Sequence, residues 1–494
     1  MCSCTKWSKN RLNNWGARQT VKDPTTDTRY RSPLAALNAY QAGLYRAFRH
    51  HLTRQTPSVC MALFMLAMSA PLAFGQWDWR SELPGFNAYD NDTRRTSKER
   101  VSERKRFRER LSLRMATEFR SLDPLISQTT IESLRGAIVR YRKMVAAGGW
   151  KTIEGNRIRR TDSGEQVLRL RRHLYMIGDL RKFRRRRARN FDDALEIAVA
   201  RFQQRHGLRI TGFVNRQTLH ALNVPARDRL MQLEINLARI VEMLKANDGK
   251  RYVLVNVPAF QLEAVDGERL ALRSNVVVGR SDRVTPSLTA KIIGLNFLPY
   301  WRVPDSISSK DLIPEIRKNP AYFREQKFSL LKKWGAEPID PSLIDWSSPD
   351  IYNYKFRQDP GPHNALGLVR INMPNKHIVY LHDTPLKKLF GSSFRAYSSG
   401  CVRVEKVMDL VGWLLSDEEE DWSPDRVEVT MQSGVSTDIR LKEAVKVRFT
   451  YITAWTTEDG APHFRQDLYG RDGEVEFYGD DKVDQVAGVE AITP

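Results

Sequence analysis

The segment from His377 to Val404 constrains the fold more than any other part of this chain of 494 residues. It opens with the apolar run His377-Ile-Val-Tyr-Leu-His382, which is typical of a β-strand. Because alternate residues of a strand point to opposite faces, His377 and His382 cannot share a face. Cys401 follows nineteen positions after His382, directly behind Ser398-Ser-Gly400. Only one of these histidines can therefore face the cysteine, and we expect it to be His382.

Cys401 is a candidate nucleophile. A thiol reacts as thiolate, so it needs a base or a positive field beside it, and His382 can be that base. Gly400 would let the backbone approach a substrate carbonyl closely. An isolated cysteine is more often a small buried apolar residue, and an isolated histidine a surface or core residue. The cysteine count favours reactivity, because the other three cysteines lie in or before a predicted export signal: Cys2, Cys4 and Cys60.

Residues 1–76 are predicted to be a leader and signal peptide. Val59–Phe74 is an apolar run that is short for a membrane span and is interrupted by Pro71. Ala73-Phe-Gly75 has the small-x-small form of a cleavage site. We therefore expect export to the periplasm or cell envelope, with a mature chain that begins at Gln76. The alternatives are a buried helix and an uncleaved signal, and the latter would keep the chain at a membrane.

The formal net charge of +22 at pH 7 favours anionic partners. A nucleic acid, a membrane surface and an acidic polymer all fit this charge. The run Arg181–Arg189 is the densest basic segment. It is accompanied by no zinc-ligand spacing, no stacking-aromatic motif and no phosphate-binding glycine loop. We therefore expect no nucleic acid, and in an exported protein we expect an anionic wall polymer.

The hydrophobic pattern divides the chain into five parts and predicts an α+β fold. The first part is the leader, and a charged linker follows at 77–120. Residues 121–250 have helical periodicity, with a unit of three short helices at about 155–224 that Ser163-Gly-Glu-Gln166 opens as a capping box. Residues 251–435 are mostly β. Residues 436–494 are predicted to be a hairpin and a tail.

A long insertion, residues 304–356, interrupts the β-rich part. Two stretches of it are expected to be helical, Ile307–Lys318 and Tyr322–Trp334. A segment of this length between core strands is more often a lid over a site than a loop. The alternative is a surface excursion without a role. The terminal hairpin is expected from Val445–Trp455 and Phe464–Leu468.

The cysteine motif resembles a known family. His382, followed by Ser398-Ser-Gly-Cys-Val-Arg403, resembles the active-site signature of the L,D-transpeptidases, the YkuD-type catalytic domain. Many small members carry a histidine directly before the glycine, where this chain has Ser399. Further segments resemble the large Gram-negative branch of the family, namely Asn256–Phe260, Val278–Pro286, Asp359–Gly367 and Asn372–Pro374. The helical unit at 155–224 resembles the peptidoglycan-binding domain that is often joined to cell-wall enzymes.

The resemblance implies acyl transfer on peptidoglycan stem peptides, which act as donor and acceptor. Cys401 would attack a diaminoacyl carbonyl, release D-Ala and form a thioester, and an amine of a second stem would then form a 3→3 cross-link. His382 would act as the base. No metal and no organic cofactor is implied.

The resemblance also implies supporting roles for residues near the thiol. Backbone N–H groups at Ser399 to Cys401, Gly400 included, would bind the oxyanion, and the main-chain carbonyl of Asp383 would orient the histidine. Arg403 would pair with a substrate carboxylate or brace the turn. Asn364 is a candidate for substrate contact.

Two other classes of function remain open. A hydrolase of wall peptides would use the same Cys401 and His382, with water resolving the thioester. A non-catalytic wall-binding scaffold would need neither residue.

Overall fold

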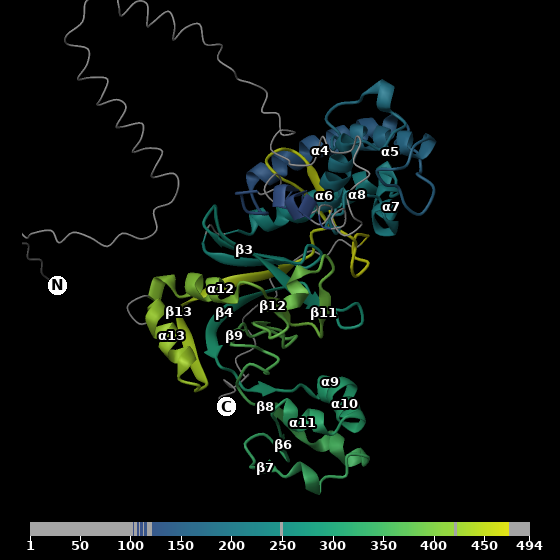
Figure 1. The fold of residues 1–494 in the computed structure, drawn as a ribbon. Coiled ribbons are helices and arrows are strands. Elements are labelled where there is room, and N and C mark those ends of the chain that lie inside the picture. The colour runs from purple at the N-terminus through teal and green to yellow at the C-terminus, as the bar shows by residue number, and fades with distance from the viewer. Residues whose placement is uncertain are drawn as a thin grey trace, which may run out of the picture. The chain divides into compact units, whose positions relative to one another are not determined.

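The computed structural model describes residues 121–247, 250–418 and 422–473, with isolated positions between 102 and 115. All of these belong to one compact unit, Thr96–Pro494. A helical region precedes a mostly β domain into which a smaller sheet with short helices is inserted (Figure 1). The predicted α+β fold is thereby confirmed. The predicted leader and signal peptide lie outside the described residues, as does most of the charged linker 77–120.

Two long helices, α4 (Gln128–Ala146) and α8 (Ala226–Lys245), pack side by side. Ser127 caps α4 by accepting a hydrogen bond from the Thr130 N–H. The apolar positions three and four apart are buried, as their spacing predicts: Ile131, Leu134, Ile138 and Tyr141. These helices cover one face of the main sheet and share a core with its first strands.

The three-helix unit consists of α5 (Glu165–Met176), α6 (Asp193–Arg205) and α7 (Arg216–Leu222) around a core of its own. Asp192 and Asn215 cap α6 and α7 with side-chain oxygens. The predicted capping box at Ser163 is wrong. Helix α5 starts behind Gly164, whose φ of 115° places it in a conformation that favours glycine, and no side chain caps this helix. Ser163 instead forms an isolated bridge with Asn190.

The main sheet has nine strands in the order β11-β3-β12-β10-β9-β4-β13-β1-β2. Because β2 also pairs with β3, the strand order closes on itself. In β1 (Tyr252–Asn256) the period of two directs Val253 and Val255 into the sheet's own core and Leu254 towards the helices. The other strands are β2 (Gln261–Asp266), β3 (Arg269–Gly279), β4 (Leu288–Phe297), β9 (Val369–Asn372), β10 (Leu381–His382), β11 (Ala396–Ser398), β12 (Val402–Val404) and β13 (Thr437–Thr450).

The sheet extends beyond the boundary at 435 that the sequence suggests. Strand β13 lies between β4 and β1 and pairs with both. An irregularity between Arg440 and Val445 divides its pairing with β4. The segment Val445–Trp455 is therefore not one arm of a terminal hairpin. Its first part belongs to β13 and completes the main sheet. The pairing partners of β13 lie far earlier in the chain, β1 almost two hundred residues earlier, so the local sequence does not indicate them.

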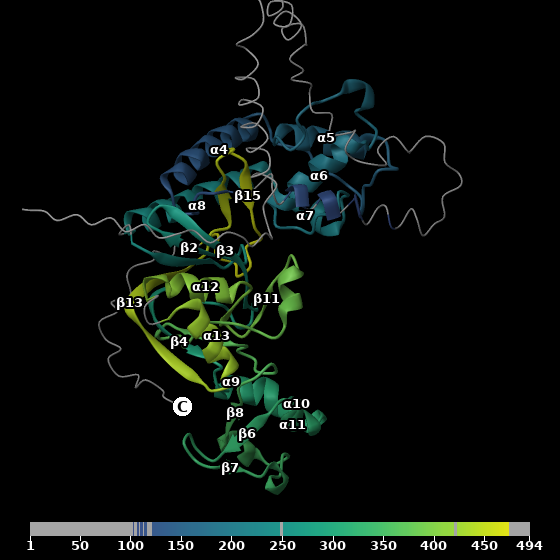
Figure 2. The same ribbon diagram turned by 60° about the vertical axis from the view of Figure 1, so that its left-hand side comes forward.

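The terminal hairpin is shorter than predicted and consists of β14 (Ala454–Thr456) and β15 (Pro462–Phe464). It packs beside α4 and α8 (Figure 2). Arg205, at the end of α6, is almost fully buried and bonds to the Pro462 carbonyl. The same guanidinium forms an ion pair with Asp179, 2.6 Å between Nη2 and Oδ2. This pair joins the three-helix unit to the hairpin.

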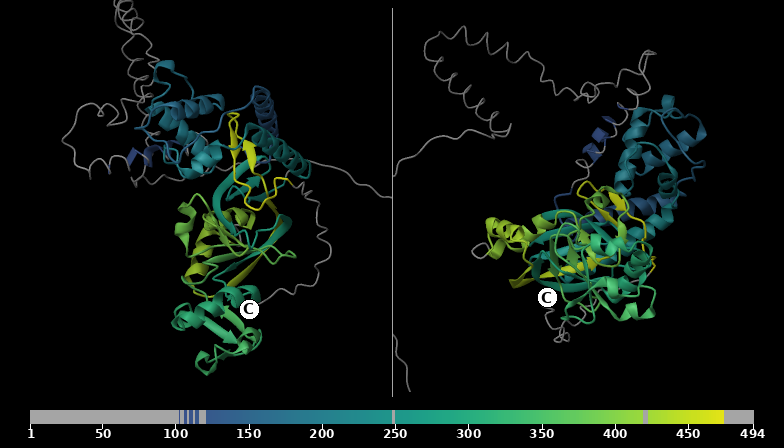
Figure 3. Two further views of the ribbon diagram at one scale, coloured as in Figure 1. Left: turned by 90° about the vertical axis from the view of Figure 1, so that its right-hand side faces the viewer. Right: turned by 60° about the horizontal axis from the view of Figure 1, so that its bottom comes forward.

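The insertion forms a small subdomain with its own four-stranded sheet, in the order β5-β8-β6-β7, and its own apolar core (Figure 3). The predicted helix at Tyr322–Trp334 is wrong beyond Glu325. Lys327 adopts a φ of 54°, and Phe328–Leu331 is strand β6. The other elements are β5 (Trp301–Arg302), α9 (Asp305–Ile307), the π-helix η2 (Ser308–Leu312), α10 (Ile313–Lys318), α11 (Ala321–Glu325), β7 (Pro338–Ile339) and β8 (Lys355–Gln358).

Helix α12 (Val407–Leu414) packs its apolar face against the core of the main sheet, and α13 (Pro424–Gln432) follows it. Among the described residues, no helix has the length and apolar character needed to cross a membrane.

Buried neutral histidines should make the fold sensitive to acid. His173 is buried and stacks on Trp150, with ring centroids 4.4 Å apart. Burial, with nearby Arg229 and Arg205, lowers the pKa of His173 to about 3. Because the unfolded chain binds this proton near pH 6.5 and the folded chain does not, stability is lost as the pH falls below 6.5.

His173→Phe should therefore reduce the acid-induced loss of unfolding free energy by about 2 kcal/mol at pH 5. The measurement is urea unfolding between about pH 7 and pH 5. The exposed His220 of α7 provides the control, His220→Phe, which should leave the pH dependence unchanged. An identical loss in His173→Phe and in the unaltered protein would contradict this account.

Candidate active site

The parallel pair β10–β12 brings His382 and Cys401 to the same face of the sheet. His382 lies opposite Arg403, and the Val402 N–H donates to the Tyr380 carbonyl at 3.0 Å. The same register continues one step outside the strands and places Tyr380 opposite Cys401. Since alternate residues share a face, four side chains project together. They are Tyr380, His382, Cys401 and Arg403.

His377 is outside this group. It is exposed in a turn where Ile378 has a φ of 53°, so the strand begins later than the sequence suggests. The predicted choice between the two histidines agrees with this geometry, although the regular strand covers only Leu381 and His382.

Cys401 is a free, partly buried thiol. Burial raises its pKa to about 11, while hydrogen bonding with Tyr380 and the charges of Arg403 and Arg370 act in the opposite direction. The thiol is therefore protonated at neutral pH.

His382 is buried, and its ring lies edge-on to that of Tyr380, with centroids 5.7 Å apart. Burial, together with the charge of Arg403, lowers its pKa to about 3, although the backbone of Asp383 acts in the opposite direction. The imidazole is therefore neutral and can accept a proton. The resting site holds a neutral thiol beside a neutral base.

The Asp383 carboxylate takes no part in this pair. It accepts a hydrogen bond from the Leu368 N–H at 3.0 Å and forms an ion pair with Lys387. Nδ1 of His382 has no hydrogen-bond partner of regular geometry among the described residues. The backbone of Asp383 raises the pKa of the ring, and the orienting role expected for its main-chain carbonyl stays a prediction.

The turn before Cys401 is tied to itself and to a neighbouring loop. Ser398 Oγ donates to the Cys401 carbonyl at 2.6 Å and accepts from the Gly400 N–H at 3.2 Å. Gly400 has a φ of 118°, which favours glycine. Thr285 Oγ1 donates to the Gly400 carbonyl at 2.7 Å. These bonds hold the turn in one conformation.

This arrangement modifies the predicted oxyanion site. The Gly400 N–H is already bonded to Ser398, so it could bind an oxyanion only by exchanging that partner. The N–H groups of Ser399 and Cys401 make no hydrogen bond with other residues that the structure describes. They are the better candidate donors.

Asn364 is a structural residue, and its predicted role in substrate contact is wrong. It is fully buried. Its amide donates to the carbonyls of Pro299 and Asp359 at 2.9 and 3.0 Å, and its Oδ1 accepts from the Leu366 N–H at 2.8 Å. These bonds hold the loop before β9 and leave no surface for a ligand.

A cluster of arginines borders the thiol. Arg370 lies on β9 opposite His382, with its guanidinium 5.8 Å from the Tyr380 ring centroid. Arg302 and Arg357 face each other across β5 and β8 of the inserted subdomain. Burial lowers the pKa of Arg302, and the charges of Arg370 and Arg357 lower it further, so the three guanidinium groups are close. The inserted subdomain therefore extends the positive charge of the catalytic face.

Arg403, which projects beside the thiol, belongs to the same cluster, and three of these arginines are incompletely paired. Arg357, Arg370 and Arg403 each hold a buried Nε that has no hydrogen-bond partner among the residues the structure describes. A planar guanidinium with unused donors matches a carboxylate. The cluster thus fits a substrate that carries negative charge close to its reacting carbonyl.

A second link joins the inserted subdomain to the catalytic turn. Arg283 donates to Ser399 Oγ at 2.9 Å and pairs with Asp311 through both carboxylate oxygens, one of them at 3.0 Å. Asp311 lies in the π-helix η2, a local irregularity that is frequent at functional sites. Arg283 therefore bonds both to Ser399, in the turn before Cys401, and to Asp311 of the inserted subdomain.

Sequence reasoning missed Tyr380, Arg370, Arg283 and Asp311. Tyr380 had a usable signal, since it lies two residues before His382 in the alternating run. The others reach the site through strand pairing and an ion pair, which no local pattern reveals. No cluster of His, Cys, Asp or Glu suited to a metal ion occurs in the described part of the chain.

Comparison with known proteins identifies two domains. Residues 250–432 match the L,D-transpeptidase catalytic domain, YkuD, and residues 163–222 match a domain described as "Putative peptidoglycan binding domain". The chain thus carries a catalytic domain of the L,D-transpeptidase family together with a peptidoglycan-binding domain. These matches contain Cys401 and His382 in the first domain and the helices α5 to α7 in the second.

One curated relative is the "Putative L,D-transpeptidase" of Haemophilus influenzae, which is 36% identical over 224 residues. The match covers 45% of each chain, so this chain corresponds to less than half the length of that relative.

Two solved structures are also similar. The L,D-transpeptidase of Stackebrandtia nassauensis is 12% identical, with 60% of this chain and 96% of that chain covered and a TM-score of 0.24. The L,D-transpeptidase of Xylanimonas cellulosilytica is 15% identical, with 61% and 100% covered and a TM-score of 0.19.

The contact of Arg283 with Ser399 predicts an effect of the inserted subdomain on thiol chemistry. Asp311→Asn should lower the rate at which an activated peptide ester acylates Cys401 by about threefold to fivefold, since a half-exposed ion pair is lost. Ser399→Ala should have a similar effect, and the double variant should be scarcely worse, because both act through Arg283.

The matched control is Asp282→Asn, because Asp282 pairs with Arg280 and not with Arg283. It should keep the acylation rate of the unaltered protein. Fully additive effects of Asp311→Asn and Ser399→Ala would show that the two residues act independently and would contradict the proposed coupling.

Proposed function

We propose that this protein forms 3→3 cross-links between peptidoglycan stem peptides. The observation that supports this proposal most directly is the shared face of Cys401 and His382 beside the arginine cluster Arg302, Arg357, Arg370 and Arg403. A nucleophile, a base and carboxylate-binding groups together suit acyl transfer on an acidic peptide.

In the proposed first step, His382 takes the thiol proton as Sγ of Cys401 attacks the carbonyl at the L-centre of a diaminoacyl residue. The N–H groups of Ser399 and Cys401 would bind the oxyanion. The C–N bond to D-Ala then breaks, and His382 returns the proton to the leaving amine. The acyl group stays on Cys401 as a thioester.

In the second step, the side-chain amine of another stem attacks the thioester. His382 accepts a proton from this amine, the C–S bond breaks, and Cys401 regains its proton. The burial that keeps His382 neutral also keeps water from the site, which favours the amine as acceptor. The arginine cluster would hold the carboxylates of the stems.

Export is part of the same proposal, since peptidoglycan lies outside the cytoplasm. The apolar run Val59–Phe74 and the Ala73-Phe-Gly75 motif support it. Sequencing of the N-terminus of the protein from intact cells should start near Gln76, and a protein that retains Met1 in the cytoplasm would contradict export.

Incubation with purified disaccharide-tetrapeptide, followed by mass spectrometry, tests the reaction. Cys401 should gain the mass of the acyl fragment, free D-Ala should appear, and dimers joined between two diaminoacid residues should form. Cys401→Ala and His382→Ala should each nearly abolish all three products, and the double variant should be hardly worse, because members of one catalytic unit are not additive.

The control is His377→Ala, since His377 is exposed and outside the catalytic face. It should retain full activity. Tripeptide and D-Ala as the sole products, even with excess acceptor, would replace transfer by hydrolysis. The absence of both an acyl adduct and D-Ala would leave only a wall-binding scaffold.

A further inference from the structure

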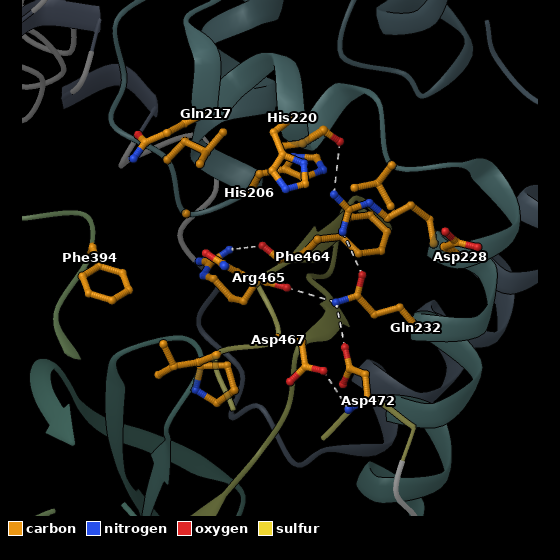
Figure 4. Close-up of a pocket in the computed structure, with 18 of the residues that line it drawn as sticks. His206, Gln217, His220, Asp228, Gln232, Phe394, Phe464, Arg465, Asp467 and Asp472 are labelled. Carbon is orange, nitrogen blue, oxygen red and sulfur yellow. Dashed lines mark hydrogen bonds between the residues drawn. The ribbon is translucent and has the colours of Figure 1, made fainter. Parts of the chain in front are cut away.

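A pocket of about 380 Å³ lies where helix α8, helix α7 and the segment after strand β15 meet (Figure 4). Cys401, His382 and the arginine cluster do not line it. Three parts of the chain form its walls: the peptidoglycan-binding domain with helix α8, the segment that follows hairpin strand β15, and two short stretches of the catalytic domain. Its apolar wall includes Phe260, Phe394, Phe464 and Leu468. A cavity of this size fits a short peptide segment or a small organic ligand.

Arg465 carries an unbalanced charge in this wall. Its Nη1 donates only to main-chain carbonyls, those of Arg205 and Phe464, at 2.9 and 2.8 Å. Its guanidinium lies so close to Gly207 that a Cβ atom there would approach Nε to 2.7 Å. Burial, together with the charge of Arg395, lowers the pKa of Arg465 to about 9. Among the described residues, no carboxylate forms an ion pair with Arg465.

Arg229 of α8 is a second such cation. It is buried, donates to Gln232 and to the Ala221 carbonyl, and lies 4.6 Å from the Phe464 ring centroid. It also forms no ion pair with a described carboxylate. Burying a charge without an ion-pair partner is costly, so two such guanidinium groups in one wall favour the binding of an anion there.

The carboxylates of the pocket form no ion pair with these arginines, although the charges of Asp472 and Asp228 act on Arg229 from a distance. Asp467 accepts from the Tyr451 hydroxyl and from the N–H groups of Arg471 and Asp472. Asp472 is bound by Thr453 and Arg239. Asp228 is exposed at the rim, and its side chain makes no hydrogen bond with other described residues. In the view of Figure 4, Asp228 lies at the right-hand side of the pocket and Arg465 nearer its middle.

We propose that this pocket is a binding site for an acidic peptide, with a carboxylate of the peptide at Arg465 and an amino group at Asp228. Phe394, which is 44% exposed, offers an apolar surface for the peptide's methyl or methylene groups. The side-chain amides of Gln217 and Gln466 line the same pocket and match a peptide backbone. The proposal rests on the proposed function only for the choice of probe.

The pocket is connected to the catalytic turn through Tyr469, directly after the lining residue Leu468. The Tyr469 hydroxyl donates to the Gly279 carbonyl at 2.7 Å and accepts from the Thr285 N–H at 3.2 Å. Thr285 in turn bonds to the Gly400 carbonyl. A peptide in the pocket would therefore contact the segment that braces the active site.

The test uses the full chain with Cys401→Ala, so that no turnover occurs, and the purified tetrapeptide stem as probe. Amide hydrogen exchange reports on segment 464–472 separately from the catalytic turn. The tetrapeptide should slow exchange in 464–472. When Arg465→Gln or Phe394→Ala is introduced into the Cys401→Ala chain, the protection should be lost and binding at this segment should weaken about tenfold. Phe394→Ala is included because Phe394 is at the surface, so this variant should fold even if Arg465→Gln does not.

Arg269→Gln is the matched control, since Arg269 is exposed and far along the sheet in the β2–β3 hairpin, and it should keep the protection. Equal protection by inorganic phosphate, or by a tetrapeptide whose carboxyl groups are amidated, would overturn the proposal, as would no protection at all. With Cys401 intact, Arg465→Gln should still form the acyl-enzyme at saturating substrate, so failure of the pocket and failure of the proposed reaction are distinguishable.

Discussion

The parallel pairing of β10 with β12 is the interaction on which the site depends. These strands are only two and three residues long, yet their register decides that His382 and Cys401 share a face. A shift of one residue would turn the thiol into the apolar core. Strands β9 and β3, which flank the pair, fix this register, and the bonds among Ser398, Gly400 and Thr285 hold the turn that enters β12.

Desolvation then determines the chemistry of that face. Burial favours the uncharged forms of both Cys401 and His382, so forming a thiolate–imidazolium pair without substrate costs free energy. The nearby guanidinium groups of Arg403 and Arg370 lower the cost of negative charge once the thiol loses its proton. The thiol proton should therefore pass to His382 during attack on a substrate. The inserted subdomain contributes to the site through Arg302 and Asp311. Asp311 acts on Ser399 indirectly, because Arg283 bonds to both residues.

Local patterns in the sequence were sufficient for some of this structure. The spacing in α4 and the three-helix unit both depend on residues near each other in the chain, and the structure agrees with each. Features that depend on distant pairing were not predictable. Strand β13 joins the sheet between β4 and β1. The side-chain amide of Asn364 donates to the carbonyl of Pro299, which lies 65 residues earlier in the chain. The same holds for Arg283 and Asp311, whose roles become visible only when the insertion is placed beside the turn.

The central claim, that Cys401 rests as a neutral thiol beside a neutral His382, can be measured directly. The chain is treated with iodoacetamide across a range of about pH 5 to pH 10, and mass spectrometry follows alkylation of the peptide that contains Cys401. The same peptide in the urea-unfolded chain serves as the control, with an ordinary thiol pKa of about 8.5. The account predicts that alkylation of the folded protein keeps rising at pH values above the midpoint of the unfolded chain, because burial raises the pKa of Cys401. A plateau with a midpoint below about pH 7 would reveal a resting thiolate–imidazolium pair and would contradict the account.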